Sequence, residues 1–178
     1  LLYCGEWIES HTLHVYMLHA PDFLGYPSAI EMAAVMPEVV TNALRLKKLG
    51  NSIMTIVGGR EIHPVNVRVG GFYRAPTKEE LRPFIEELEW GIGVAEETVA
   101  LVAGFDFPDF EMDYEFVALQ HPNEYAITDG RIVSNRGLNI DVTEWRSHFE
   151  ESHVPWSNAL HARLKERGTY HVGPMARF

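Results

Sequence analysis

The sequence contains a single cysteine, Cys4, among its 178 residues. One thiol cannot close a disulfide within the chain, and one thiolate cannot build a site in which several cysteines surround a metal ion or cluster. We therefore expect no metal-ligating set in this chain. Cys4 is interpreted as a small apolar side chain of the core.

Long apolar runs and positive charge are also scarce. Charged residues, prolines or glycines interrupt every stretch that approaches the roughly 20 apolar residues needed to cross a bilayer, so we expect no membrane span. The 15 basic residues stand against 25 acidic ones, which gives a formal net charge of -10. Because the Lys and Arg residues are not clustered, the chain would repel a phosphate backbone, and we expect no nucleic-acid partner.

The rest of the composition is typical of a folded domain. Hydrophobic residues make up 46% of the chain and charged residues 22%, and the length suffices for one sizeable core. The chain has no initiator methionine and no polar tail at its end. We therefore interpret residues 1–178 as a single internal segment of a longer subunit, truncated at both ends.

Helical periodicity dominates the N-terminal half. Spacings of three and four residues predict a helix over residues 1–20 that ends at Pro21. Its buried face would comprise Cys4, Ile8, His11, Val15 and Leu18.

Two further helices begin with capping-box signatures. Ser28 and Glu31 start the first of them, which would kink at Pro37 and end at Leu49 or continue through Gly50 to Val57. Thr77 and Glu80 start the second, an amphipathic helix that bends near Pro83 and ends at Gly104. Its apolar stripe is Leu81, Phe84, Ile85, Leu88, Ile92, Ala95, Val99 and Val102.

The remaining segments lack helical periodicity. Glycine and proline predict an irregular, partly buried loop over residues 58–76. Short strands are expected at 116–119, 125–127 and 131–133, followed by an irregular segment with a short helix. The predicted fold class is α+β: helix-rich, with the long helices of a bundle and a small antiparallel sheet.

Three histidines on the first predicted helix raise the question of a metal site. His11 and His14 stand three residues apart and could face one ion, but no third ligand is specified. We favour hydrogen-bonded core or interface histidines. In the 58–76 loop, Gly58 and Gly59 lack the spacing of a phosphate loop, and the arginines there are expected to pair with nearby carboxylates.

Three runs carry a resemblance to the large subunits of nickel-iron hydrogenases. Residues 58–66 read Gly-Gly-Arg-Glu-Ile-His-Pro-Val-Asn and resemble the family's Gly-Gly-Arg/Lys-x-x-His-Pro segment. Residues 9–16 are similar to the histidine-rich helix that follows the family's first cysteine pair. Residues 170–177 resemble its Tyr-x-Val-Gly-Pro-Leu-Ala-Arg run. Because the three occur in the family's order, the resemblance covers essentially the whole chain, which is identified as a piece of the hydrogenase large-subunit fold.

The resemblance implies a redox enzyme in the intact subunit. There, two Cys-x-x-Cys pairs hold a nickel-iron centre with carbon monoxide and cyanide on iron, and dihydrogen is reversibly oxidised to protons and electrons. The partner small subunit carries iron-sulfur clusters. Neither cysteine pair is present in these residues, so we expect no catalytic residue and no metal ligand in this segment, and no activity from the segment alone.

Residues 67–73 are closest to the cytoplasmic, bidirectional members of that family. The resemblance therefore implies a cytoplasmic enzyme with diaphorase-type subunits that use NAD(P) or coenzyme F420.

Four residues receive roles from the resemblance. His63 matches a histidine near the cluster closest to the active site, where an imidazole N–H can hydrogen-bond at the subunit interface and tune the cluster. Arg60 occupies the Arg/Lys position and is expected to pair with the small subunit or a carboxylate. Ser10 and His11 align with a His-Asp-His stretch whose aspartate lines the active-site pocket, and Ser10 replaces that carboxylate.

Two alternatives remain open on the residues alone. The same scaffold serves quinone-linked subunits of respiratory complex I and of membrane-bound hydrogenases. A non-catalytic module that docks an iron-sulfur protein would also fit the chain.

Overall fold

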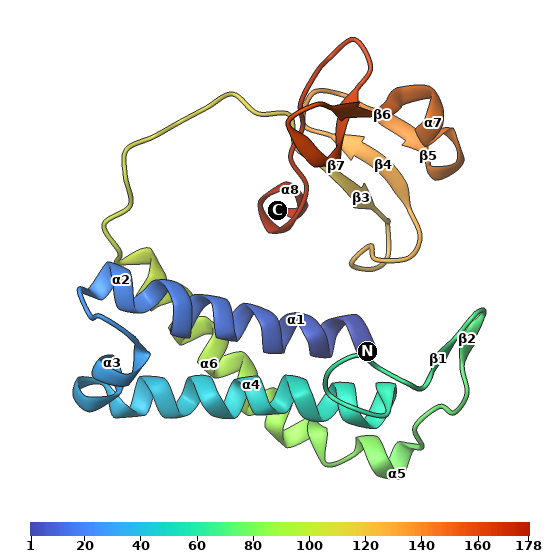
Figure 1. The fold of residues 1–178 in the computed structure, drawn as a ribbon. Coiled ribbons are helices and arrows are strands. Elements are labelled where there is room, and N and C mark those ends of the chain that lie inside the picture. The colour runs from blue at the N-terminus through green and yellow to red at the C-terminus, as the bar shows by residue number, and fades with distance from the viewer. The chain divides into compact units, whose positions relative to one another are not determined.

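The computed structural model describes residues 1–178, which form two compact units, Leu1–Pro108 and Asp109–Phe178. Unit 1 is helical apart from one short hairpin, and unit 2 contains small antiparallel sheets (Figure 1). This arrangement confirms the α+β class with long helices and a small antiparallel sheet. None of the helices is both long enough and apolar enough to cross a membrane.

Unit 1 is built from helices that follow one another with short connections. The elements are α1 (Leu2–Thr12), the π-helix η1 (Leu13–His19), α2 (Ala20–Leu24), α3 (Ala29–Val35), α4 (Pro37–Gly58), the strands β1 (Val67–Arg68) and β2 (Gly71–Phe72), α5 (Lys78–Leu81) and α6 (Phe84–Ala103).

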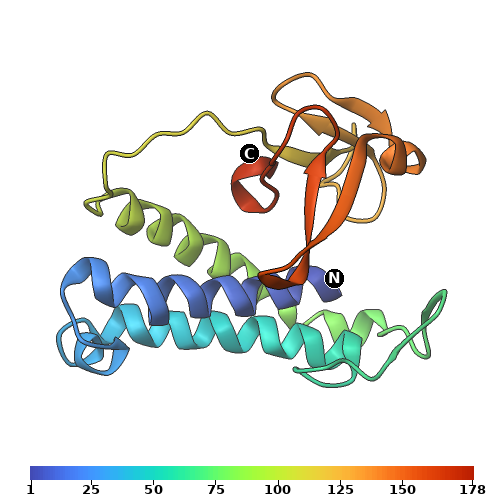
Figure 2. The ribbon, with the colours of Figure 1, turned by 45° about the horizontal axis from the view of Figure 1, so that its top comes forward.

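The closest helix packing in unit 1 lies between α1 and α4, which run antiparallel side by side (Figures 1 and 2). The two helices meet at Gly5 and Gly50. A Cβ atom built on Gly50 would lie 2.6 Å from the carbonyl oxygen of Gly5 and 2.5 Å from the backbone nitrogen of Glu9. Only glycine fits there, so the α4 helix continues through Gly50 because α1 occupies the space where a side chain would be.

The same contact decides which side of α1 is buried. The inward residues are Gly5 and Thr12, continued by Tyr16 and Ala20. The predicted face, which included Cys4 and His11, was therefore wrong by about one residue. Cys4 is exposed and does not belong to the core. The apolar periodicity was correct, but packing against α4 favours the side that carries glycine.

Two proline effects differ from expectation. The first helical segment continues through Pro21, which occupies the first turn of α2 where its missing N–H is not required, and it ends at Leu24 before Gly25. Pro37 starts a new helix after a break at Met36 instead of only kinking one. The Ser28 hydroxyl accepts from the backbone N–H of Ile30, so the predicted capping box is only partly formed.

The third predicted helix is confirmed at its start. Thr77 and Glu80 form the complete capping box, with the Thr77 hydroxyl accepting from the Glu80 N–H and the Glu80 carboxylate accepting from the Thr77 N–H. Pro83 separates α5 from α6.

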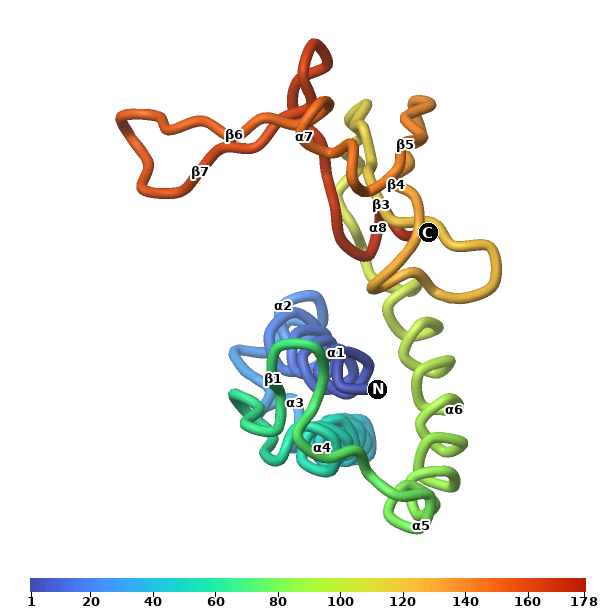
Figure 3. Tube along the Cα trace, turned by 90° about the vertical axis from the view of Figure 1, so that its right-hand side faces the viewer, coloured from blue at the N-terminus to red at the C-terminus, as the bar shows by residue number.

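The inward side of α6 contains Gly91 and Val94, and its apolar stripe is largely exposed. Gly91 packs against Leu46 and Leu49 of α4. In Figure 3, which looks along α1 and α4, α6 crosses them steeply. Exposed large side chains of the stripe are Ile85, Leu88, Ile92 and Val99.

Unit 2 contains a three-stranded antiparallel sheet in the order β3-β4-β5 and a separate hairpin, β6-β7. The hairpin extends away from the sheet (Figure 3). The elements are β3 (Val117–Gln120), β4 (Arg131–Ser134), β5 (Asn139–Asp141), the 3-10 turn η2 (Val142–Glu144), α7 (Trp145–His148), β6 (Phe149–Val154), β7 (Ser157–Leu164) and α8 (Pro174–Arg177).

The strand predictions were partly wrong. Residues 125–127 form no strand, and β4 pairs with β3 across the longer connection of residues 121–130. The segment expected to be irregular forms the hairpin of β6 and β7, whose register pairs Phe149 with Leu164. Pairing of this kind depends on partners distant in sequence, which alternation alone does not identify.

A buried ion pair ties unit 2 together. The Glu115 side chain is 2% exposed and accepts from Arg167 and from the Ser134 hydroxyl, each at 2.7 Å. The backbone of the same segment pairs with His171 near the C-terminus. Glu115 therefore joins three parts of unit 2 that are far apart in sequence.

We predict that Gly50→Ala lowers the free energy of unfolding of the chain by about 1–3 kcal/mol, because the added methyl group meets the backbone of α1. Gly93→Ala is the matched control. Gly93 also lies inside a helix, but nothing lies within 4 Å of its added Cβ atom. The control should raise the free energy by about 0.5–1 kcal/mol. Urea unfolding followed by circular dichroism measures both, and equal effects would contradict the close packing.

We predict that Glu115→Gln lowers the free energy of unfolding by roughly 1.5–3 kcal/mol, because the charged hydrogen bond to Arg167 is lost inside unit 2. Asp113→Asn is the control. Asp113 pairs with Arg136 at 2.7 Å, but its side chain is 91% exposed, so no measurable change is expected. A smaller loss for Glu115→Gln than for Asp113→Asn, measured by thermal unfolding, would refute this account.

Candidate functional site

The segment that joins α4 to α5, residues 59–77, carries two of the predicted site residues. It leaves α4 at Gly59, whose φ of 86° is left-handed and ends the helix. The Gly58 carbonyl then accepts hydrogen bonds from the backbone N–H groups of Val65 and Asn66, both at 2.9 Å. These bonds close residues 59–64 into a loop at the end of α4 (Figure 2).

Asn66 organises this segment. Its side-chain amide donates to the carbonyls of Val57 at 2.8 Å and Arg74 at 2.6 Å, and its side-chain oxygen accepts from the Arg74 N–H at 3.1 Å. The residue therefore holds the end of α4, the loop and the far side of the β1–β2 hairpin in one place. Sequence reasoning missed this role, although an asparagine in a segment rich in glycine and proline is a signal of side-chain-to-backbone bonding.

His63 lies in the closed loop, exposed, with a left-handed φ of 53°. A non-glycine residue in this conformation is uncommon, and such residues concentrate at functional positions. The Arg60 side chain donates to the carbonyl of Ile62, directly before His63. Arg60 thus bonds to backbone within the loop and not to a carboxylate of this chain.

A second arginine makes the expected ion pair. Arg74 contacts the Glu80 carboxylate at 2.9 Å. This contact, followed by the hydrogen bond from the Thr77 N–H, holds the pKa of Glu80 below its ordinary value. A lowered pKa means that the contribution to stability is present above the unfolded-state pKa and is lost as the pH falls through the folded-state value. The anchor of the segment on α5 is therefore an acid-sensitive contact.

The exposed surface of residues 59–77 combines apolar and basic groups. Arg68 lies over the ring of Tyr73, with 5.6 Å between the guanidinium carbon and the ring centroid. Exposed apolar side chains that protrude from so small a segment are typical of a protein–protein contact. They are Ile62, Val65, Val67, Val69, Phe72 and Tyr73.

Ser10 and His11 lie on α1, both exposed. They are eight and nine residues beyond Leu2, the α1 residue next to Gly58, which corresponds to about 12 Å along a helix axis. The structure therefore does not bring them next to the loop of His63. Their neighbour Glu9 points toward α4, where its carboxylate pairs with Lys47 at 2.8 Å.

The structure pairs two histidines other than those expected. The Nε2 atoms of His14 and His19 lie 2.7 Å apart, and the rings meet edge to face. The predicted combination of His11 with His14 is not formed. No group of three or more His, Cys, Asp or Glu side chains converges to hold a metal ion. With Cys4 alone and exposed, the donor set of this chain does not fit a nickel-iron centre.

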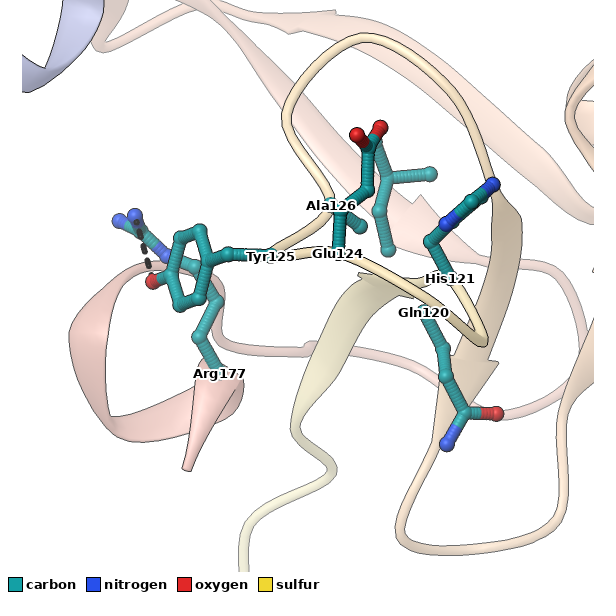
Figure 4. Close-up of a pocket in the computed structure, with 7 residues that line it drawn as sticks. Gln120, His121, Glu124, Tyr125, Ala126 and Arg177 are labelled. Atoms are coloured by element: carbon teal, nitrogen blue, oxygen red, sulfur yellow. Dashed lines mark hydrogen bonds between the residues drawn. The ribbon is translucent and has the colours of Figure 1, made fainter.

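A small pocket of about 160 Å³ lies in unit 2. Figure 4 shows His121 and Tyr125 on its wall, with a hydrogen bond of 3.3 Å from the Arg177 guanidinium to the Tyr125 hydroxyl. Arg177 ends the 170–177 run singled out in the sequence. The hydrogen bond ties that run to the connection between β3 and β4, so it organises the end of unit 2.

Known proteins resemble this chain along nearly its whole length, although no protein-family model matches it. The alpha subunit of sulfhydrogenase 1 from Pyrococcus furiosus is 34% identical over 179 residues, which is 99% of this chain and 42% of that protein. The alpha subunit of sulfhydrogenase 2 from the same organism is 46% identical over 99 residues, 56% of this chain and 24% of that protein.

A methanogen protein and a solved structure extend the comparison. The corresponding vhu protein of the F420-non-reducing hydrogenase of Methanocaldococcus jannaschii is 29% identical over 99% of this chain and 48% of its own length. A chain of an NAD+-reducing NiFe hydrogenase in the H2-reduced state shares the fold, with a TM-score of 0.85 and 22% identity over 99% of this chain and 45% of that one. The present chain thus spans less than half the length of these relatives.

We predict that Asn66→Ala loosens residues 59–77 without unfolding the helices, because three hydrogen bonds are lost at one point. Amide hydrogen exchange in this segment should accelerate roughly tenfold or more, since that rate change corresponds to about one lost hydrogen bond. The control is Asn158→Ala, an exposed asparagine of β7. Unchanged exchange at residues 59–77 in Asn66→Ala would contradict the role given to Asn66.

Proposed function

Since the chain is homologous over 99% of its length to hydrogenase large-chain proteins, we propose that it is part of the catalytic large subunit of a nickel-iron hydrogenase. The intact subunit would oxidise dihydrogen reversibly to protons and electrons, as an oxidoreductase. The observation that carries this proposal is the 34% identity to the sulfhydrogenase 1 protein across the whole chain. The shared fold, at a TM-score of 0.85, supports it.

Within that enzyme, this chain would supply support and contact surface and not metal ligands. Its one cysteine is exposed on α1, and no group of side chains converges to hold an ion. We therefore propose that the nickel-iron centre, with its carbon monoxide and cyanide ligands, is held by parts of the subunit outside residues 1–178. These residues would form a single internal segment, and by themselves they would be inactive.

Residues 59–77 are the proposed contact with the small subunit that carries the iron-sulfur clusters. Their exposed apolar side chains and arginines favour a protein partner. His63 would donate a hydrogen bond across the interface toward a cluster and tune it. Arg60 would support His63 indirectly, because its side chain holds the Ile62 carbonyl next to it.

Ser10 and His11 would belong to a different face. Both are exposed on α1, on a helix side that this chain leaves uncovered. We propose that they meet the remainder of the large subunit near the active-site pocket. Electron acceptors would be reached through further subunits that use NAD(P) or coenzyme F420, in a cytoplasmic complex.

The proposal is tested on the full-length gene product, produced together with its small subunit. We expect bound nickel and hydrogen-dependent reduction of a dye. A full-length protein that binds its partner without nickel or activity would instead be a docking module. A protein that lacks nickel but reduces quinone within a larger complex would be a quinone-linked relative.

We predict that His63→Ala in the full-length enzyme slows electron transfer to the dye or alters the response to oxygen, and leaves the nickel content unchanged. The physical reason is that an imidazole at the interface affects the cluster and not the metal ligands. His161→Ala, an exposed histidine on β7, is the control and should leave all three properties unchanged. Loss of nickel in His63→Ala would show that the assigned role is wrong.

A further inference from the structure

The π-helix η1 determines the spacing of the two paired histidines. His14 and His19 are five residues apart, which on an α-helix would place them about 140° apart around the axis. Hydrogen bonds between residues five apart, such as that from the Ala20 N–H to the Val15 carbonyl, bring them onto one side. Tyr16 and Ala20 cover the buried side of the same segment, so the histidine pair is on the exposed side.

From this geometry we propose that His14 and His19 form a two-histidine site for a divalent late first-row metal ion. Both Nε2 atoms point at the same region, 2.7 Å apart. Two imidazole nitrogens bound at about 2.0–2.1 Å and at a right angle would lie about 2.9 Å apart. A tetrahedral ion would need about 3.3–3.4 Å at the same bond lengths. The observed separation therefore favours the square-planar or tetragonal geometry of Cu²⁺ or Ni²⁺ over tetrahedral Zn²⁺.

The chemistry of binding is balanced without an added reagent. In the metal-free pair, one Nε2 donates its proton and the other accepts it. The donating imidazole moves that proton to its own Nδ1 as the neutral tautomer, which frees both Nε2 lone pairs for the metal. Solvent would complete the coordination, because no third side chain joins the pair. This site does not depend on the proposed hydrogenase function.

The test is a titration of the chain, purified without a histidine tag, with Cu²⁺ alone. We expect one ion bound per chain, with an electron paramagnetic resonance signal showing two nitrogen ligands. His14→Ala and His19→Ala should each weaken binding on the order of 100-fold, because each removes the benefit of two linked ligands. The matched control is His11→Ala, an exposed histidine on the preceding turn, which should bind as the unchanged chain does. Zn²⁺ should compete poorly.

Several results would overturn the site. They are the absence of a two-nitrogen signal, equal affinity in the His14→Ala, His19→Ala and unchanged chains, or an equal loss of affinity in His11→Ala. Circular dichroism of each variant establishes that the helix is intact. Should His14→Ala unfold, His14→Gln retains a hydrogen-bonding side chain of similar reach and must still lose the ion.

Discussion

The contact of Gly5 with Gly50 is the constraint on which unit 1 depends. Two backbones approach each other there without a side chain between them, so α1 and α4 lie closer together than larger residues would allow. The contact fixes the rotation of α1 about its axis. That rotation buries Thr12 and Tyr16, and it exposes Cys4, Ser10 and His11.

The position of the proposed interface follows from the same packing. Because α4 continues past Gly50 to Gly58, its final carbonyl reaches Val65 and Asn66 and closes the loop that carries His63. Had the helix ended at Leu49, the loop would have lost its anchor. Asn66 then adds side-chain bonds to both edges of the segment. A rigid helix end and one asparagine thus hold an exposed histidine in a left-handed conformation, which a free loop would rarely adopt.

Unit 2 is stabilised in a different way. Its strands are short, and its buried apolar cluster is small, comprising Val117, Leu138, Ile140 and Leu164. A buried carboxylate with two satisfied partners joins the first strand region to the C-terminal turn. Buried ion pairs specify an arrangement more than they add stability, because desolvation offsets much of their attraction.

Local signals in the sequence were sufficient for much of the fold. The Thr77–Glu80 capping box, the break near Pro83 and the end at Gly104 were predicted correctly, because each depends on residues within one helical turn. The strands near 117–120 and 131–134 were also found. The run at 58–66 indicated where the loop lies, although neither its closure by Gly58 nor the role of Asn66 could be read from neighbouring residues.

The sequence by itself determined the class of the chain, its helical periods and its family resemblance, and it left too few cysteines for a metal centre. Only the tertiary structure decided which side of each helix is buried, which strands pair and which histidines meet. The reason is physical. Periodicity defines an apolar stripe to within about one residue, but the choice among neighbouring sides depends on the partner helix, here through two glycines. Likewise, His14 meets His19 only because the chain adopts a π-helix there, which changes the spacing that an α-helical reading assumes.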